Sequence, residues 1–164
     1  MRDPKPIAGG RALLFERLSE EDPHSPREEA RPHRAHDEEA LRASVRRELS
    51  LLLNTRRHTN LFREAGGEEA TVLDYGVPDF SSLSASSSED QRLLAETIKG
   101  AVAAFEPRLQ GVSVRVERLR QEDRALLLRV EARLVIGTVA EPVSFPLLLR
   151  GKLGRTEVCE DERA

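Results

Sequence analysis

The sequence has very little cysteine and few aromatic residues. Cys159 is its single cysteine, tryptophan is absent, and aromatic residues make up 4% of the 164 residues. One thiol can form neither an internal disulfide nor a thiolate metal cluster, so burial of apolar side chains, mainly Leu and Val, must hold the fold together. Long apolar runs and a secretory signal are also missing, and we therefore expect a cytoplasmic protein with no direct membrane insertion.

Positive charge is not in excess either. The chain carries 26 basic and 29 acidic residues, a net charge of −3. Proteins that neutralise phosphates need a basic surface, so no nucleic-acid partner is expected.

Motifs for metal, nucleotide or acyl-transfer chemistry are not evident. The Gly-Gly pairs lack the Lys-Ser of a phosphate loop, and no serine lies in a G-x-S-x-G turn. Only His33 and His36 have a spacing suited to a metal, but they fall in a segment with nothing to orient them. We expect no cofactor and no metal.

Residues 1–36 are predicted to form a flexible arm. Residues 1–39 hold seven basic and ten acidic side chains and five prolines, too little apolar surface to offset the entropy of ordering. The exception is a short amphipathic helix near residues 13–18, with Phe15 and Leu18 on one face. Two interpretations stay open, a turn folded onto the protein's own core or a docking element for a partner.

Residues 37–155 are predicted to form the domain, and two amphipathic helices begin it. Asp37 is a suitable cap for a helix that runs to about Leu53, and Ser88 opens an S-x-x-Q capping box for a second helix that Pro107 ends. Apolar residues recur every three or four positions in each: Leu41, Val45, Leu49 and Leu52, then Leu94, Ile98, Ala101, Val102 and Phe105.

Between these helices, residues 71–88 are predicted to be irregular. The first half is apolar and is expected to lie on the core, whereas the serine run after Phe80 is expected to be a solvated linker.

The remainder has the alternation of β-strands. Residues 112–116 and 126–134 predict a hairpin with one apolar and one charged face, and residues 143–150 predict a third strand. Pro146 cannot donate to a ladder, which places this strand at an edge. Residues 156–164 are expected to be a frayed acidic tail. The predicted fold class is α+β, with two main helices packed on one face of a small antiparallel sheet.

One enzymatic interpretation needs only carboxylates. Asp74, Asp79 and Glu106 lie in segments expected to be ordered, and two carboxylates suffice for glycoside cleavage. A peptidoglycan-cleaving, lysozyme-like enzyme is therefore the alternative function, although the few aromatic residues give little for a sugar to stack on.

Glu106-Pro107-Arg108 places opposite charges on either side of a rigid proline, between the second helix and the first strand. The side chains can form an ion pair that fastens this connection, or present a rigid contact to a protein partner, and the two interpretations are compatible.

Four short motifs together resemble the type VI secretion baseplate subunit TssE, which is related to a baseplate wedge subunit of contractile phage tails. The resemblance spans about residues 13–150. It is carried by Phe15-Glu16-Arg17-Leu18, Val45-Arg46-Arg47-Glu48-Leu49 to Leu53-Asn54-Thr55-Arg56, Val72-Leu73-Asp74-Tyr75-Gly76-Val77-Pro78-Asp79, and Glu106-Pro107-Arg108.

The resemblance implies a non-catalytic assembly protein. It implies that Glu106, Pro107 and Arg108 contact the core helical bundle of the wedge proteins TssF and TssG, that TssK-type subunits are further partners, and that the sheet acts as a template for the first sheath ring. An open strand edge can accept an extended segment of the sheath protein, with Arg129, Glu131 and Arg133 setting register and specificity.

Overall fold

The computed structural model describes residues 10–11, 35–36, 38–57, 71–120, 125–136, 139–150 and 155–159. Two helices, a short 3₁₀ turn and six strands lie in these ranges. In chain order they are β1 (Gly10–Arg11), β2 (Ala35–His36), α2 (Glu38–Asn54), η1 (Val72–Asp74), α3 (Ser88–Phe105), β3 (Leu109–Arg120), β4 (Ala125–Ile136), β5 (Val139–Arg150) and β6 (Arg155–Val158).

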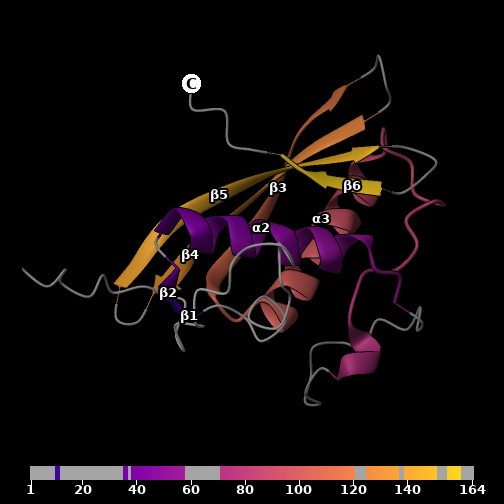
Figure 1. The fold of residues 1–164 in the computed structure, drawn as a ribbon. Coiled ribbons are helices and arrows are strands. Elements are labelled where there is room, and N and C mark those ends of the chain that lie inside the picture. The colour runs from indigo at the N-terminus through magenta and orange to yellow at the C-terminus, as the bar shows by residue number, and fades with distance from the viewer. Residues whose placement is uncertain are drawn as a thin grey trace, which may run out of the picture.

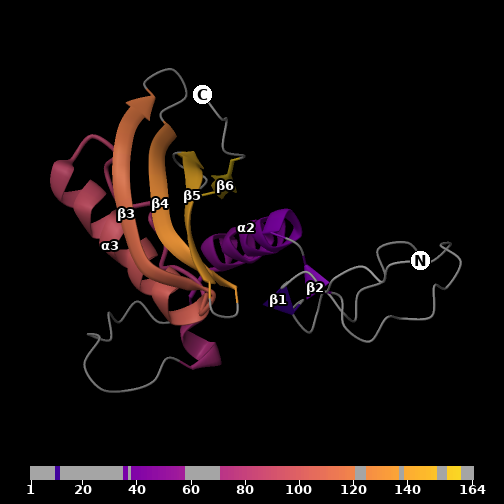
Figure 2. The same cartoon turned by 90° about the vertical axis from the view of Figure 1, so that its left-hand side faces the viewer.

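The main sheet is antiparallel, in the order β3-β4-β5-β6. Both helices cover one of its faces, α3 along β3 and α2 towards β6 (Figures 1 and 2). The α+β class and the packing of two helices on one face of a small antiparallel sheet are confirmed. The sheet has four strands, one more than the sequence predicted.

The core lies between the helices and the sheet because each element contributes one apolar stripe. The helical stripes predicted from the sequence are buried except for Ala101 and Phe105, which are partly buried, and the alternate residues of β4 and β5 that face them are buried as well. The fully buried large side chains include Leu41, Val45, Leu49, Leu53, Ile98, Val102, Leu128, Val130, Leu134 and Leu147.

Helix ends follow local chemistry. The helix predicted to end at about Leu53 ends at Asn54, and α3 ends at Phe105, as Pro107 predicts. The cap of α3 is Ser87 rather than Ser88, since the Ser87 hydroxyl accepts a hydrogen bond from the Asp90 amide at 3.3 Å. Asp37, the predicted cap of α2, lies outside the described residues.

The edge position predicted for the third strand is wrong. β5 is bonded to β4 along its whole length and to β6 at Leu147–Arg150. The carbonyl of Pro146 faces away from β4 and accepts a hydrogen bond from the Cys159 amide at 2.8 Å. The nitrogen and the carbonyl of one strand residue point to the same side, so the nitrogen of Pro146 also faces away from β4, next to the end of the β5–β6 pairing. The missing donor therefore costs no bond to β4.

The prediction of a frayed tail is also wrong for residues 156–158, which belong to β6. The side-chain amide of Asn54 bonds both backbone groups of Thr156, donating to its carbonyl at 2.8 Å and accepting from its amide at 3.0 Å. The last residue of α2 thus fixes a strand that the sheet alone would hold by one edge.

In the predicted arm, β1 pairs with β2, with Gly10 opposite His36. The helix predicted near 13–18, with Phe15 and Leu18, lies outside the described residues. In residues 71–88, Val77 and Phe80 are buried as expected, but Val72 and Leu73 are exposed, contrary to expectation.

Candidate functional site

The Glu106-Pro107-Arg108 segment forms the turn between α3 and β3. The Glu106 amide donates to the Val102 carbonyl at 2.9 Å and closes the helix, and the Leu109 amide donates to the Glu106 carbonyl at 3.0 Å and closes the turn. The Arg108 carbonyl accepts from the Val135 amide of β4 at 2.9 Å. The backbone of this turn is therefore bonded to both elements that it joins and to the next strand.

The side chains of this turn form a buried clamp. Nε and Nη2 of Arg108 donate to the two carboxylate oxygens of Glu106, each at 2.7 Å, and Nη1 donates to the Ser44 hydroxyl of α2 at 2.8 Å. The side chains of Arg108 and Glu106 are 14% and 5% exposed. A fork of this kind is the strong form of a charge-assisted hydrogen bond, and here it ties the α3–β3 corner to α2.

Burial decides which part of the turn a second protein can reach. Glu106 and Ser44 are buried and their polar groups are bonded within the chain. Pro107 is exposed at the tip of the turn. The internal ion pair considered from the sequence is therefore present, and it presents Pro107, with the rim of Arg108, to the outside.

Arg129, Glu131 and Arg133 lie on β4, on the face of the sheet opposite the helices. Arg129 is paired with Glu117 of β3 and donates to Ser144 of β5 at 3.0 Å, and Glu131 is paired with Arg115 of β3. Since β4 is bonded to strands on both sides, these side chains do not line an open edge. Their partners Arg115 and Glu117 do, because β3 is the first strand of the sheet.

The two edge strands of the sheet differ in how their outer backbone groups are bonded. At β6 the backbone groups of Thr156 are already bonded to Asn54. A helix lies against each edge strand, α2 against β6 and α3 against β3. Among the strands that the structure describes, none lies beyond β3 along its 12 residues (Figure 2). Two register shifts, one next to Gly111 with its φ of 64°, bend this edge, and bulges of this kind limit unspecific pairing.

Each of the three carboxylates of the enzymatic interpretation is hydrogen-bonded to neighbouring residues. Asp74 accepts from the amide and hydroxyl of Thr71, and Glu106 is bound by Arg108. Asp79 accepts from the amide and hydroxyl of Ser81, and these bonds hold the pKa of Asp79 below its ordinary value. Each carboxylate thus has a local structural partner.

In the described ranges, no three His, Cys, Asp or Glu side chains are placed to hold a metal ion. No helix among the described residues is long and apolar enough to span a membrane.

The sequence did not reveal the roles of Ser44 and Asn54, the two residues through which α2 holds the turn and the last strand. Only the small size of Ser44 on the apolar stripe of α2, where a bulkier residue is usual, was a signal in the sequence.

Comparison with known proteins assigns the family. Residues 39–138, which include α2 from its second residue, α3, the Glu106-Pro107-Arg108 turn and the β3–β4 hairpin, match the family described as baseplate wedge protein gp25. The chain belongs to this family. The gp25 match gives it a structural role in a baseplate, and the similarity to baseplate subunits expected from the four motifs is confirmed at the family level.

Two solved structures resemble this gp25-family chain. One is from "The baseplate complex from the type VI secretion system", with 15% identity and a TM-score of 0.47, covering 67% of this chain and 94% of that chain. The other is a putative tail lysozyme from Geobacter sulfurreducens, with 20% identity and a TM-score of 0.42, covering 65% and 88%. No curated protein matches the sequence.

Proposed function

We propose that the chain is the TssE-like subunit of a type VI secretion baseplate, a non-catalytic cytoplasmic protein that joins the wedge core to the first ring of sheath. The observation that carries this proposal is the family match over residues 39–138, which contains both candidate contact elements, the α3–β3 turn and the open edge of β3. The motifs that resemble TssE specify the type VI form of the baseplate.

The wedge contact is assigned to the tip of the Glu106-Pro107-Arg108 turn. Glu106 and Arg108 act from inside by fixing the turn to α2 and β4, and Pro107 faces the helices of TssF and TssG. A proline held in one conformation loses little entropy on binding, which favours a rigid contact of this kind. TssK-type subunits are proposed as partners within the same wedge, and no particular surface of this chain is assigned to them.

The sheath contact is assigned to the outer edge of β3. Strand addition needs unpaired backbone groups, and β3 offers them over a longer stretch than β6, where Asn54 occupies Thr156. Arg115 and Glu117 lie on this strand and set the register of the added segment. Arg129 and Glu131 hold them in place from β4, and Arg133 offers an exposed charge on the same face.

The assembly role is tested by purifying the tagged full-length chain from its native cell and identifying the bound proteins by mass spectrometry. Recovery of wedge and sheath proteins supports the proposal, and recovery of neither contradicts it. The sheath contact is tested separately with sheath protein that lacks its terminal segments. Docking should be lost, and docking that persists would show that strand addition is wrong.

The alternative function is peptidoglycan cleavage. Its test is the activity of the purified protein on peptidoglycan, compared with Glu106→Gln. We expect no activity in either protein, because the Glu106 carboxylate is engaged by Arg108. Activity in the wild type that Glu106→Gln abolishes would favour the enzyme.

A further inference from the structure

Two adjacent apolar side chains project from η1. Val72 is 81% exposed and Leu73 is 74% exposed, the highest values among the large apolar side chains that the structure describes. A single exposed leucine is common on protein surfaces. Two such neighbours at the tip of one turn form a small apolar knob.

The tip of this knob is held in shape by its own hydrogen bonds. The amide and hydroxyl of Thr71 donate to Oδ2 of Asp74 at 2.9 and 2.8 Å, and the Asp74 amide donates back to the Thr71 carbonyl at 2.9 Å. This closed ring fixes the backbone that carries Val72 and Leu73. The knob is therefore ordered before any partner arrives, which lowers the entropy lost on binding.

The base of the knob is fixed to the end of α2. Gly76 has a φ of +107°, and a Cβ at this position would lie 2.4 Å from the Thr55 carbonyl oxygen. The Val77 amide donates to that oxygen at 2.9 Å, the Arg57 amide donates to the Val77 carbonyl at 2.9 Å, and the Val77 side chain is fully buried. The segment after the knob thus cannot move without opening the core.

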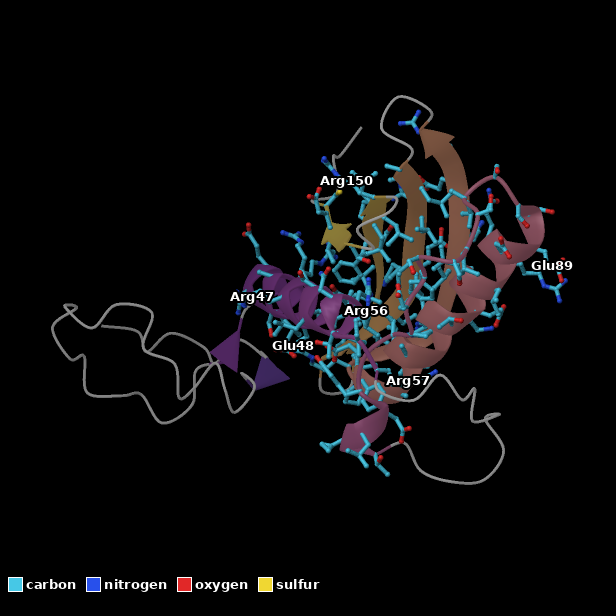
Figure 3. All side chains as sticks on the ribbon, turned by 90° about the vertical axis from the view of Figure 1, so that its right-hand side faces the viewer. Arg47, Glu48, Arg56, Arg57, Glu89 and Arg150 are labelled. Atoms are coloured by element: carbon cyan, nitrogen blue, oxygen red, sulfur yellow. The ribbon has the colours of Figure 1, made fainter. Side chains whose placement is uncertain are left out.

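The side of the knob is joined to the end of α3. The rings of Tyr75 and Phe105 meet edge to face, with centroids 5.3 Å apart. Burial, followed by the charges of Glu48 and Glu106, raises the pKa of Tyr75, which agrees with a position beside the Glu106-Pro107-Arg108 turn. Figure 3 shows η1 projecting from the packed body of the molecule. The knob and the turn therefore lie at the same end of the domain.

We infer that Val72 and Leu73 insert into an apolar groove between helices of the wedge protein that contacts Pro107. Two side chains bury far less than the roughly 800 Å² per partner of a stable interface, so the knob must belong to a larger contact surface. The neighbouring turn supplies that surface. The inference rests on the proposed wedge contact and extends it, and it explains why a loop so firmly held leaves two apolar residues in water.

The test is the paired substitution Val72→Asp and Leu73→Asp in the full-length chain. Because both side chains are exposed, the thermal unfolding midpoint should stay unchanged. Recovery of the wedge protein from the native cell should fall about tenfold or more, as for a central apolar anchor. Leu93→Asp is the matched control, since Leu93 is an exposed leucine on α3 (41%) and should bind like the wild type.

The outcomes separate the inference from the function on which it rests. If the knob variant recovers the wedge proteins like the wild type while Pro107→Asp loses them, the knob makes no wedge contact, and the contact proposed for Pro107 is retained. Absence of wedge proteins with the unmodified chain would overturn both. A photo-crosslinker at position 73 should capture the protein that one at position 107 captures. Capture of a second copy of this chain at position 73 would overturn the inference, and this readout holds if the aspartate variant fails to fold.

Discussion

Two kinds of Arg–Glu pair occur in this domain, and they differ in what surrounds them. The pair at the α3–β3 corner is buried, bidentate and bonded to Ser44. The pairs of Arg115 with Glu131 and of Arg129 with Glu117 lie on the face of the sheet opposite the two described helices. Water screens the second kind, whereas the first leaves a costly charge behind if one partner is lost. The same residue types therefore hold the fold at the corner and are available for recognition on the sheet.

The largest effect is expected at the buried pair. Arg108→Ala leaves the Glu106 carboxylate in a site that is 5% exposed and removes the bond to Ser44. We expect a loss of about 3–5 kcal/mol in the free energy of unfolding, measured by urea denaturation. A loss below about 1 kcal/mol would show that water reaches the carboxylate and that the corner resembles the sheet face.

Replacement of both partners should cost less than removal of one. Glu106→Leu with Arg108→Leu leaves no charge in the corner, so we expect a stability within about 2 kcal/mol of the wild type. The same denaturation measurement gives the coupling energy when Glu106→Leu alone and Arg108→Leu alone are included. Additive losses would mean that the two side chains do not act as a pair.

The outer pairs should contribute much less. Arg115→Ala, whose side chain is 69% exposed, should lower the free energy of unfolding by less than about 1 kcal/mol, and high salt should remove the difference. A larger loss that persists in high salt would show that the exposed pair stabilises the fold as strongly as the buried pair, contrary to this prediction.

The smallest effect is expected from Tyr75, which lies beside the corner. Its folded-state pKa is above 10, the ordinary value, first because of burial and then because of Glu48 and Glu106. The neutral phenol is favoured in the folded state, so stability is complete below pH 10 and falls as the pH rises from 10 through the folded-state pKa. Tyr75→Phe should lack this alkaline loss in thermal melts at pH 9 to 11. An identical loss in both proteins would assign it to other groups.

The sequence was sufficient where the pattern is local. The alternation of Val112, Val114 and Val116 with charged residues predicts a strand with one apolar face, and the stripe from Leu41 to Leu52 predicts the buried side of α2. The Glu-Pro-Arg spacing predicts the ion pair itself. These features depend on neighbours within a few positions, so fold class and element order follow from them.

Features that depend on distant partners could not be predicted in this way. β6 has only four residues, and its bonds to Asn54 join positions 102 apart. The third member of the clamp, Ser44, is 64 positions from Arg108. The edge position predicted from Pro146 was wrong because the nitrogen of Pro146 points towards β6, next to the end of the β5–β6 pairing. The sequence of β5 alone does not show where β6 ends.

The Glu106-Pro107-Arg108 turn is fixed from within, and we propose that it contacts the wedge core through its tip. The most direct measurement compares wedge-protein recovery and unfolding midpoint for the tagged wild type and Pro107→Asp, purified from the native cell in equal folded amounts. We expect Pro107→Asp to keep the wild-type midpoint and to lose the wedge proteins. Wild-type recovery by Pro107→Asp would contradict it, because the exposed tip would then make no contact.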